Sequence, residues 1–274
     1  MKKVFYLCAA LTVSLAMLFV SCNREEPDNN ENNEVTQEIQ LLPQAVTDID
    51  GNCYDAVQIG EQVWMAENLR TTKYADGTAI PLATGGSLSP CRYAPGSGET
   101  YEENAVNVTH FGYLYNWPAV MHEDTASSDI PSGVQGICPS GWHVPSAAEW
   151  TKLTNYVSSL SQCQCDSNSV NIAKSLASNT DWESSSNHCA IGNDLNNNNA
   201  TGFSALPAGG YFVGTPIEWD FVGYKHFGGG AYFWSSTLYN GEYPIHNCFS
   251  YANATVSMTS YQKSAGFSVR CIRD

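Results

Sequence analysis

The first 22 residues decide the conditions under which the rest of the chain folds. Met1-Lys2-Lys3 is a short basic start, Val4 to Val20 is almost wholly apolar, and Ser21 places a small residue before Cys22. This order is typical of a cleaved export signal, and the apolar run is too short and wrongly flanked for a membrane span. We therefore expect the chain to fold outside the cytoplasm, where cysteines form disulfides.

The residues at the end of the apolar run favour a lipid anchor. Phe19-Val20-Ser21-Cys22 resembles a lipobox, in which the cysteine becomes the lipidated first residue, although Phe19 is bulkier than usual. The alternative is an ordinary secretory signal with Cys22 as a bystander. We predict a signal peptide over 1–21 and lipid attachment at Cys22, with the protein held in the outer membrane and exposed at the cell surface. The periplasmic face is the alternative location.

Residues 22–44 are rich in Asn, Glu and Asp and have few apolar residues before Val35. Such a segment cannot bury enough apolar surface to offset the entropy of ordering it, so we expect a disordered acidic tether. Glu25-Glu26-Pro27-Asp28 resembles the acidic signal by which some Bacteroidota lipoproteins reach the surface. The remaining residues, 45–274, suit one domain in length.

The acidic charge balance restricts the partners of the chain. The formal net charge is −15, and it becomes −17 when Lys2 and Lys3 leave with the signal. This surface argues against nucleic acid as a partner and suits neutral glycans, cationic partners or calcium. Solubility alone is the simpler explanation.

Cysteines are frequent beyond the anchor. An even number in an exported chain predicts disulfides, four at most, whose connectivity does not follow from spacing. A zinc site of Cys163, Cys165, His188 and Cys189 is the alternative, although the spacing fits no common zinc pattern. The eight cysteines are Cys53, Cys91, Cys138, Cys163, Cys165, Cys189, Cys248 and Cys271.

Local patterns predict an α+β domain. A hairpin is expected over 46–60, because Asp50-Gly51-Asn52 can form its turn between alternating apolar residues. Ser146 and Glu149 form a capping-box pattern that opens a helix with Trp150, Leu153, Val157 and Leu160 on one face. A second helix is expected over 169–177. Short antiparallel strands are expected at 62–65, 203–206, 210–213, 231–237, 245–251 and 267–272, which makes a sheet carrying two main helices.

Several phrases along the domain are shared with one family. The chain resembles the Fibrobacter succinogenes major paralogous domain, found in surface lipoproteins of Bacteroidota and relatives, over nearly all of 45–274. The phrases include Ile59-Gly-x-Gln-x-Trp-Met-Ala-Glu-Asn-Leu69, Cys138-Pro-x-Gly-Trp-His-Val-Pro-Ser146, Phe233-Trp-Ser-Ser-Thr237 and Ser268-Val-Arg-Cys-Ile-Arg273.

The same phrases are more distantly similar to the C-terminal domain of a Legionella collagen-like adhesin and to the formylglycine-generating enzyme group. That similarity implies a C-type-lectin-like arrangement in a single disulfide-stapled domain. It also implies that Cys138, before the first main helix, pairs with Cys271 on the last strand.

The hairpin turn offers a candidate metal site. Asp48, Asp50, Asn52 and Asp55 cluster oxygen ligands and resemble part of a calcium loop, but the Glu that closes an EF-hand is missing. The alternative is an Asp-Gly turn whose side chains cap the backbone. Calcium is accordingly the one cofactor that we consider.

Aromatic residues between the shared phrases are the candidate ligand-binding groups. Aromatic faces in loops grip sugar rings by stacking, with polar groups at the ring edges, whereas the simpler alternative is packing within a loop-rich domain. The candidates are Tyr211, Trp219, Tyr224, Tyr232, Tyr239 and Tyr243.

These observations favour a non-catalytic binding or adhesion role at the cell surface, with glycans or surface proteins as partners besides the membrane. One alternative is an enzyme on a formylglycine-generating-enzyme-like fold, and another is a structural component of the envelope. No catalytic residue is identified, because no shared phrase aligns the required cysteine pair and His143 has no marked nucleophile beside it.

Overall fold

The computed structural model describes residues 39–83, 85–215 and 218–274, without the side chains of 215–221. The predicted signal peptide, Cys22 and most of the predicted tether therefore lie outside the described residues. Residues Gln37–Asp274 form one unit by their mutual contacts. Within the described residues, no helix combines the length and apolar character needed to cross a membrane.

The predicted N-terminal hairpin is present and starts earlier than expected. Strand β1 (Gln40–Thr47) pairs antiparallel with β2 (Cys53–Ile59), which pairs with β3 (Gln62–Met65). Residues 40–44, predicted to belong to the tether, are thus part of a strand. The reason is that Leu41 and Leu42 lie opposite Val57 and Ala56 in the ladder.

The main helix, α4 (Ala147–Ser159), begins where the capping box predicts. The Ser146 hydroxyl accepts a hydrogen bond from the Glu149 amide at 3.2 Å, and the Glu149 carboxylate accepts one from the Ser146 amide at 2.9 Å. Trp150, Leu153 and Val157 are buried on one face, as the helical spacing requires.

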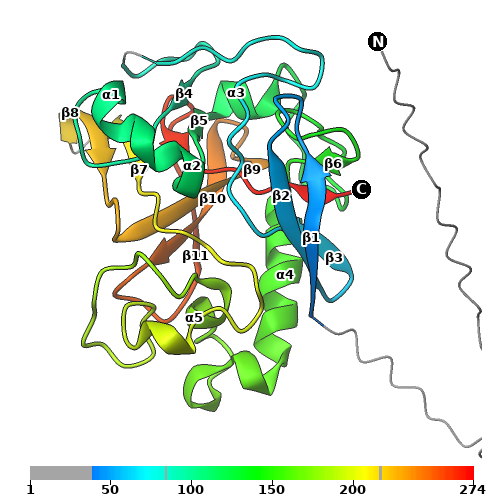
Figure 1. Ribbon diagram of the computed structural model, residues 1–274, viewed down its shortest axis with the longest axis vertical. Coiled ribbons are helices and arrows are strands. Elements are labelled where there is room, and N and C mark those ends of the chain that lie inside the picture. The colour runs from blue at the N-terminus through cyan, green and yellow to red at the C-terminus, as the bar shows by residue number, and fades with distance from the viewer. Residues whose placement is uncertain (1–38, 84, 216–217) are drawn as a thin grey trace, which may run out of the picture. The chain divides into compact units, whose positions relative to one another are not determined.

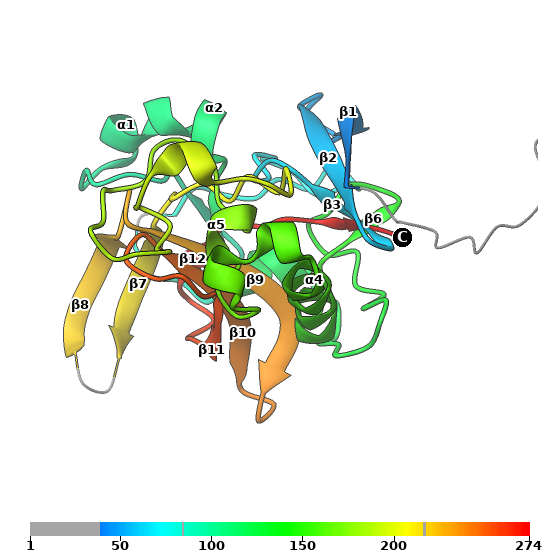
Figure 2. The same ribbon diagram turned by 90° about the horizontal axis from the view of Figure 1, so that it is seen from below.

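Helix α4 packs against two sheets (Figures 1 and 2). Its buried face joins Val57, Ile59 and Trp64 of the N-terminal hairpin region and Phe233 and Phe249 of the later strands in one apolar cluster. At about 25 cal/mol per Å² of apolar surface, such burial is the main stabilising contribution. The helix is therefore the element that joins the early and late parts of the domain.

The stretch between residues 71 and 121, where the sequence pattern predicts no element, contains short helices. Thr100 forms a second capping box with Glu103 at the start of α1. A single turn of helix needs only a local cap of this kind, so the sequence has no long periodic pattern that would predict it. The elements are β4 (Arg92–Tyr93), α1 (Tyr101–Asn104), η1 (Ala105–Asn107), α2 (Val108–Phe111), β5 (Leu114–Asn116) and α3 (Trp117–Met121).

The second predicted helix is much shorter than expected. Only α5 (Ala173–Leu176) is α-helical in the 169–177 stretch, preceded by the 3-10 turns η2 (Ser161–Cys163) and η3 (Cys165–Ser167), and η4 (Leu195–Asn197) follows later. Val170 is 56% exposed, so the apolar spacing that favoured a longer helix is not used for burial before Ile172, and Ala177 ends α5 in an extended conformation. The expectation of two main helices is therefore wrong, because α4 is the only described α-helix longer than five residues.

The later strands differ in detail from the prediction. Residues 203–206 are not a strand, since only Ala205 forms a bridge, with Ala177. The predicted strand over 267–272 is split in two around the buried Val269, Arg270 and Cys271. The observed strands are β6 (Trp142–His143), β7 (Gly210–Thr215), β8 (Glu218–Lys225), β9 (Gly230–Tyr239), β10 (Tyr243–Ser250), β11 (Ser257–Ser260), β12 (Gly266–Phe267) and β13 (Ile272–Arg273).

The strands form three antiparallel sheets, of order β1-β2-β3-β13-β6, β11-β10-β9 and β4-β5-β12-β7-β8. Strands β12 and β13 are close in sequence but belong to different sheets, so the C-terminal segment joins two of them. The domain is thus α+β with antiparallel strands, as predicted.

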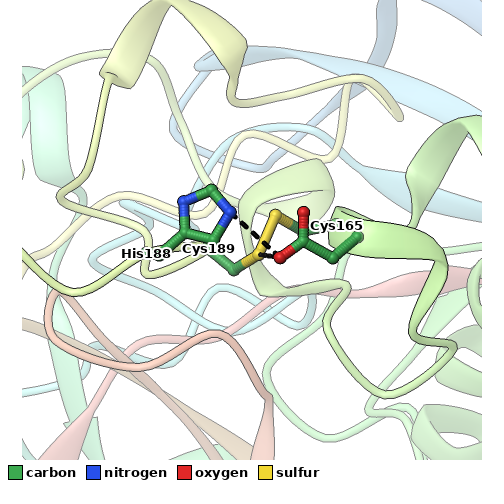
Figure 3. Close-up of side chains that lie close together, drawn as sticks. Cys165, His188 and Cys189 are labelled. Carbon is green, nitrogen blue, oxygen red and sulfur yellow. Dashed lines mark hydrogen bonds and ion pairs between the residues drawn. A yellow bond between two sulfur atoms is a disulfide. The ribbon is translucent and has the colours of Figure 1, made fainter.

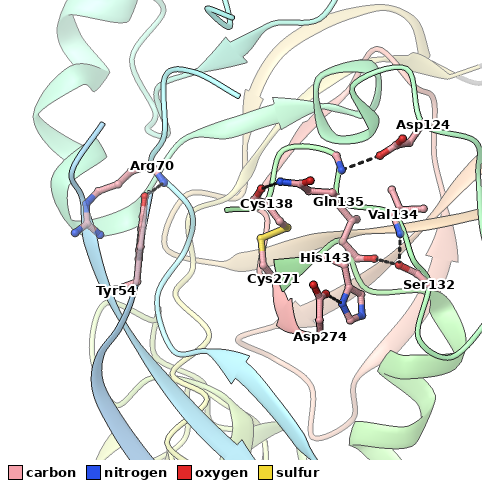
Figure 4. Close-up of a disulfide and its surroundings, with 12 residues drawn as sticks. Tyr54, Arg70, Asp124, Ser132, Val134, Gln135, Cys138, His143, Cys271 and Asp274 are labelled. Atoms are coloured by element: carbon pink, nitrogen blue, oxygen red, sulfur yellow. Dashed lines mark hydrogen bonds and ion pairs between the residues drawn. A yellow bond between two sulfur atoms is a disulfide. The ribbon is translucent and has the colours of Figure 1, made fainter. Parts of the chain in front are cut away.

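A buried disulfide joins two parts of the domain that are far apart in the sequence (Figure 4). Cys138 and Cys271 are bonded at 2.03 Å, are both fully buried, and lie 133 residues apart in the chain. The predicted pair is therefore confirmed. A second disulfide joins Cys165 and Cys189.

Two disulfides are thus present in the described part of the chain, where the sequence allowed up to four. The other cysteines there are free thiols, and burial raises the pKa of three of them, Cys91, Cys163 and Cys248. Cys53 is exposed.

Candidate ligand-binding site

Two of the predicted ligand-binding tyrosines lie at the tip of the β9–β10 hairpin. Tyr239 and Tyr243 are directly opposite each other in the ladder and are 56% and 42% exposed. Asn240 and Gly241 between them have left-handed φ values of 50° and 73°, which an Asn-Gly pair adopts readily. The turn therefore holds two aromatic side chains at an exposed edge.

The segment that follows β11 forms the facing wall. The Tyr261 amide donates to the Pro244 carbonyl at 3.1 Å, and the Trp117 amide donates to the Lys263 carbonyl at 3.0 Å. The Lys263 ammonium lies 5.1 Å from the centre of the Trp117 ring. These contacts fix the wall against the hairpin on one side and against α3 on the other.

Between the hairpin tip and this wall lies an open groove of about 620 Å³. One acidic and one basic side chain, Glu242 and Lys263, line it with hydroxyl and amide groups, so its charge is balanced although the chain is acidic. This composition offers ring faces together with donors and acceptors. The lining residues are Leu88, Tyr239, Glu242, Tyr243, Ser260, Tyr261, Gln262, Lys263 and Ser264.

Tyr239 also lines a neighbouring hollow of about 380 Å³ with Ile245 and Met258 of β10 and β11. The Met258 side chain is 41% exposed. Tyr239 therefore lines both the groove and this hollow, and a ligand in either one would touch its ring.

Three other predicted aromatic residues, Tyr211, Tyr224 and Tyr232, do not line this groove. Tyr211 and Tyr232 are buried, at 8% and 9% exposure, and Tyr224 is half-buried against Tyr211 with ring centres 5.1 Å apart. Burial raises the pKa of all three phenols. They pack within the domain, as the simpler alternative held. The side chain of Trp219 lies outside the described residues.

The Asp48 side chain, in the predicted calcium loop, stabilises the hairpin turn. Its carboxylate accepts hydrogen bonds from the amides of Asp50 and Asn52 at 3.0 and 2.9 Å and from the Tyr54 hydroxyl at 2.5 Å. Gly51 adopts a left-handed φ of 83° at the corner. This is how an Asx turn closes a hairpin.

The remaining carboxylates of that loop are directed elsewhere. Asp50 lies 3.1 Å from the Lys73 ammonium, and although burial opposes the effect, hydrogen bonds from Thr72 and Lys73 lower the pKa of Asp50. Asp55 accepts a hydrogen bond from the Gln44 amide at 2.8 Å. The side chains of Asp48 and Asn52 thus hydrogen-bond to each other within the turn, while those of Asp50 and Asp55 bond to groups elsewhere in the chain.

His143, the histidine of the shared phrase Cys138–Ser146, lies in the core beside the Cys138–Cys271 disulfide (Figure 4). It is 3% exposed, with Nε2 2.9 Å from Glu149 and Nδ1 2.7 Å from Asp274. It thereby ties the start of α4 to the last strand. It lines neither the groove beside Tyr239 nor the adjoining hollow.

Several groove residues escaped the sequence reasoning, among them Leu88, Glu242, Gln262 and Lys263. The Asn240-Gly241 pair was a usable signal, since it marks a hairpin tip and so places Glu242 next to the tyrosines. Leu88 and Lys263 come together only through the tertiary fold, and no local pattern could indicate them.

Comparison with known proteins gives one match. The model of a family described as the Fibrobacter succinogenes major domain matches residues 57–273. No curated protein matches the chain, and no solved structure does.

Proposed function

The chain belongs to the Fibrobacter succinogenes major domain family, and on that premise we propose that its domain is a non-catalytic binding module for a neutral glycan. The observation that carries the proposal is the pair of exposed tyrosines, Tyr239 and Tyr243, at the edge of the groove. Large aromatic side chains left this exposed at a hollow are a feature of interaction sites.

The groove chemistry suits a sugar better than an ionic ligand. A pyranose ring has an apolar C–H face that stacks on an aromatic ring and hydroxyls that need both donors and acceptors. Tyr239 and Tyr243 supply the faces, while Glu242 accepts, Lys263 donates, and Gln262 does both. Because the groove carries one charge of each sign, it has no excess of positive or negative charge that would select an anion or a cation.

We place this module on a lipid anchor at Cys22, exposed at the cell surface, in a C-type-lectin-like arrangement. The export signal and Phe19-Val20-Ser21-Cys22 support the anchor. The pairing of β13 with β3 and the Cys138–Cys271 bridge support the arrangement, because the pairing returns the end of the domain to its first strands and the bridge fixes that end to the middle of the chain. Incorporation of labelled fatty acid that is lost in Cys22→Ala tests the anchor.

The binding role is tested by screening the purified chain against plant, host and bacterial glycans, with and without calcium. We expect retention by neutral glycans that does not depend on calcium. A uniformly negative screen with a folded protein would count against the proposal.

A further inference from the structure

The second disulfide lies within a group of metal-ligating side chains (Figure 3). Asp166 and His188 are neighbours in sequence of Cys165 and Cys189, and His188 Nε2 lies 2.9 Å from Asp166 Oδ2. The same carboxylate oxygen lies 3.5 Å from the Cys189 sulfur. One ligand atom from each of the four residues lies within 4.8 Å of all the others.

These separations approach what a single metal ion requires. Zinc binds sulfur at about 2.3 Å and nitrogen or oxygen at about 2.0–2.2 Å, so two of its ligands are at most about 4.6 Å apart. In the disulfide, however, the two sulfurs are bonded to each other and neither is a thiolate. The cluster therefore lacks its two strongest ligands while the bridge is closed.

We propose that reduction of the Cys165–Cys189 disulfide converts this cluster into a zinc site with Cys165, Asp166, His188 and Cys189 as ligands. A dithiol reductant supplies two electrons and two protons, so the S–S bond breaks into two thiols and the reductant becomes a disulfide. Zn²⁺ binding then displaces both thiol protons, since thiolates are the ligands. The two segments that carry these four residues are therefore joined either by the disulfide or by the metal ion, and never by both at once.

Other contacts hold both segments in place without the bridge. On the first, the Cys165 amide donates to the Asn171 carbonyl at 2.9 Å, and the Ser175 hydroxyl donates to the Cys163 carbonyl at 2.7 Å. On the second, the Gly192 amide donates to the Tyr251 carbonyl at 2.8 Å. Opening the disulfide thus leaves the four ligands near one another.

The cluster is also accessible. The side chains of His188 and Asp166 are 74% and 61% exposed, and the two bridging cysteines line an open hollow of about 320 Å³ with His188. Cys189 is buried and Cys165 is half-buried, so a reductant reaches the bridge through this hollow from the Cys165 side. The Cys138–Cys271 bridge, by contrast, is fully buried, so mild reduction should open the loop disulfide first.

Titration of the full chain with Co²⁺ and Zn²⁺, before and after mild dithiol treatment, tests the proposal. Peptide mapping establishes which disulfide has opened, and circular dichroism reports the fold. We expect one Co²⁺ per reduced chain with thiolate-to-cobalt absorption, displacement by Zn²⁺, and protection of Cys165 and Cys189 from alkylation. The oxidised chain should bind neither ion at this site.

Variants locate the site. His188→Ala and Asp166→Asn should each weaken Zn²⁺ binding at least about tenfold, while Cys53→Ser, which removes an exposed thiol elsewhere, should leave it unchanged. Equal affinity in His188→Ala and the parent, or equal binding before and after reduction, overturns the proposal. So does a reduced chain that stays folded and binds no zinc, or one that unfolds and does not refold when zinc is added.

Discussion

His143 Nδ1 lies 2.7 Å from Asp274 Oδ1, so the buried histidine of the shared phrase Cys138–Ser146 is paired with the residue that follows the last strand. Its other ring nitrogen contacts the buried Glu149. Burial alone would lower the pKa of His143, but the two carboxylates outweigh it and raise that pKa above 6.5. The two carboxylates therefore favour the protonated, charged form of the imidazole.

This pairing predicts a pH-dependent stability. Because the folded pKa is raised, the stabilisation is fully present below pH 6.5, the unfolded value, and is lost as the pH rises through the folded pKa. His143→Gln should therefore lower the melting temperature most at about pH 6 and less at about pH 8 to 9. A difference from the parent that stays constant over this range contradicts the charged pairing.

We expect truncation of the Arg270 side chain to cause a large loss of stability. It is fully buried, and its guanidinium donates to Asn68 Oδ1 at 2.7 Å and to the carbonyls of Met65, Phe203 and Ser204 at 2.6–2.9 Å. Burial lowers its pKa to about 9, so it remains charged at neutral pH.

Arg270→Ala should cost about 3–5 kcal/mol of unfolding free energy, because buried acceptors lose their donors and a cavity opens. Arg270→Lys should recover only part of this unfolding free energy, since an ammonium group cannot reproduce the planar set of donors that a guanidinium presents. The exposed Arg273 of β13 provides the control, and Arg273→Ala should stay within about 0.5 kcal/mol of the parent in urea unfolding. Comparable losses at both positions would refute the role given to Arg270.

The two disulfides should differ in their effect on stability. They close sequence separations of 133 and 24 residues. Chain entropy then gives a stabilisation of about 5 kcal/mol for Cys138–Cys271 and about 3.5 kcal/mol for Cys165–Cys189. Paired Cys→Ala substitutions measured by urea unfolding should lose more at the first bridge, and the reverse order would contradict this entropic account.

Local chemistry explains what the sequence predicted well. The capping box of Ser146 and Glu149 and the turn at Gly51 depend on neighbours within a few residues, so the start of α4 and the first hairpin could be located. The pairing of Cys138 with Cys271 followed from family resemblance, since no local rule joins residues so far apart.

Burial depends on the tertiary fold and was predicted less well. Tyr211 and Tyr239 are both tyrosines on strands of the glycine-rich region, yet one stacks on Tyr93 inside the domain and the other is exposed. Which face of a strand is covered depends on the packing of sheets and loops distant in sequence. Among the candidates whose side chains the structure describes, Tyr239 and Tyr243 are the two that are exposed.

These two tyrosines give the sharpest test of the binding role. Tyr239→Ala should weaken glycan binding about tenfold or more, which is about 1.4 kcal/mol, because its ring lies at the edge of the groove and of the adjoining hollow. Tyr239→Phe should keep most of the affinity if stacking is the main contribution.

Neither change should alter the unfolding free energy by more than about 0.5 kcal/mol, because the side chain is 56% exposed. Val106→Ser, at a residue that is 79% exposed and does not line the groove, is the matched control and should bind as the parent does. Isothermal titration against a glycan found in the screen gives the affinities. Full binding by a Tyr239→Ala, Tyr243→Ala double variant would place the glycan site elsewhere on the domain. If glycan binding is lost in the double variant but kept in each single variant, either ring suffices for stacking.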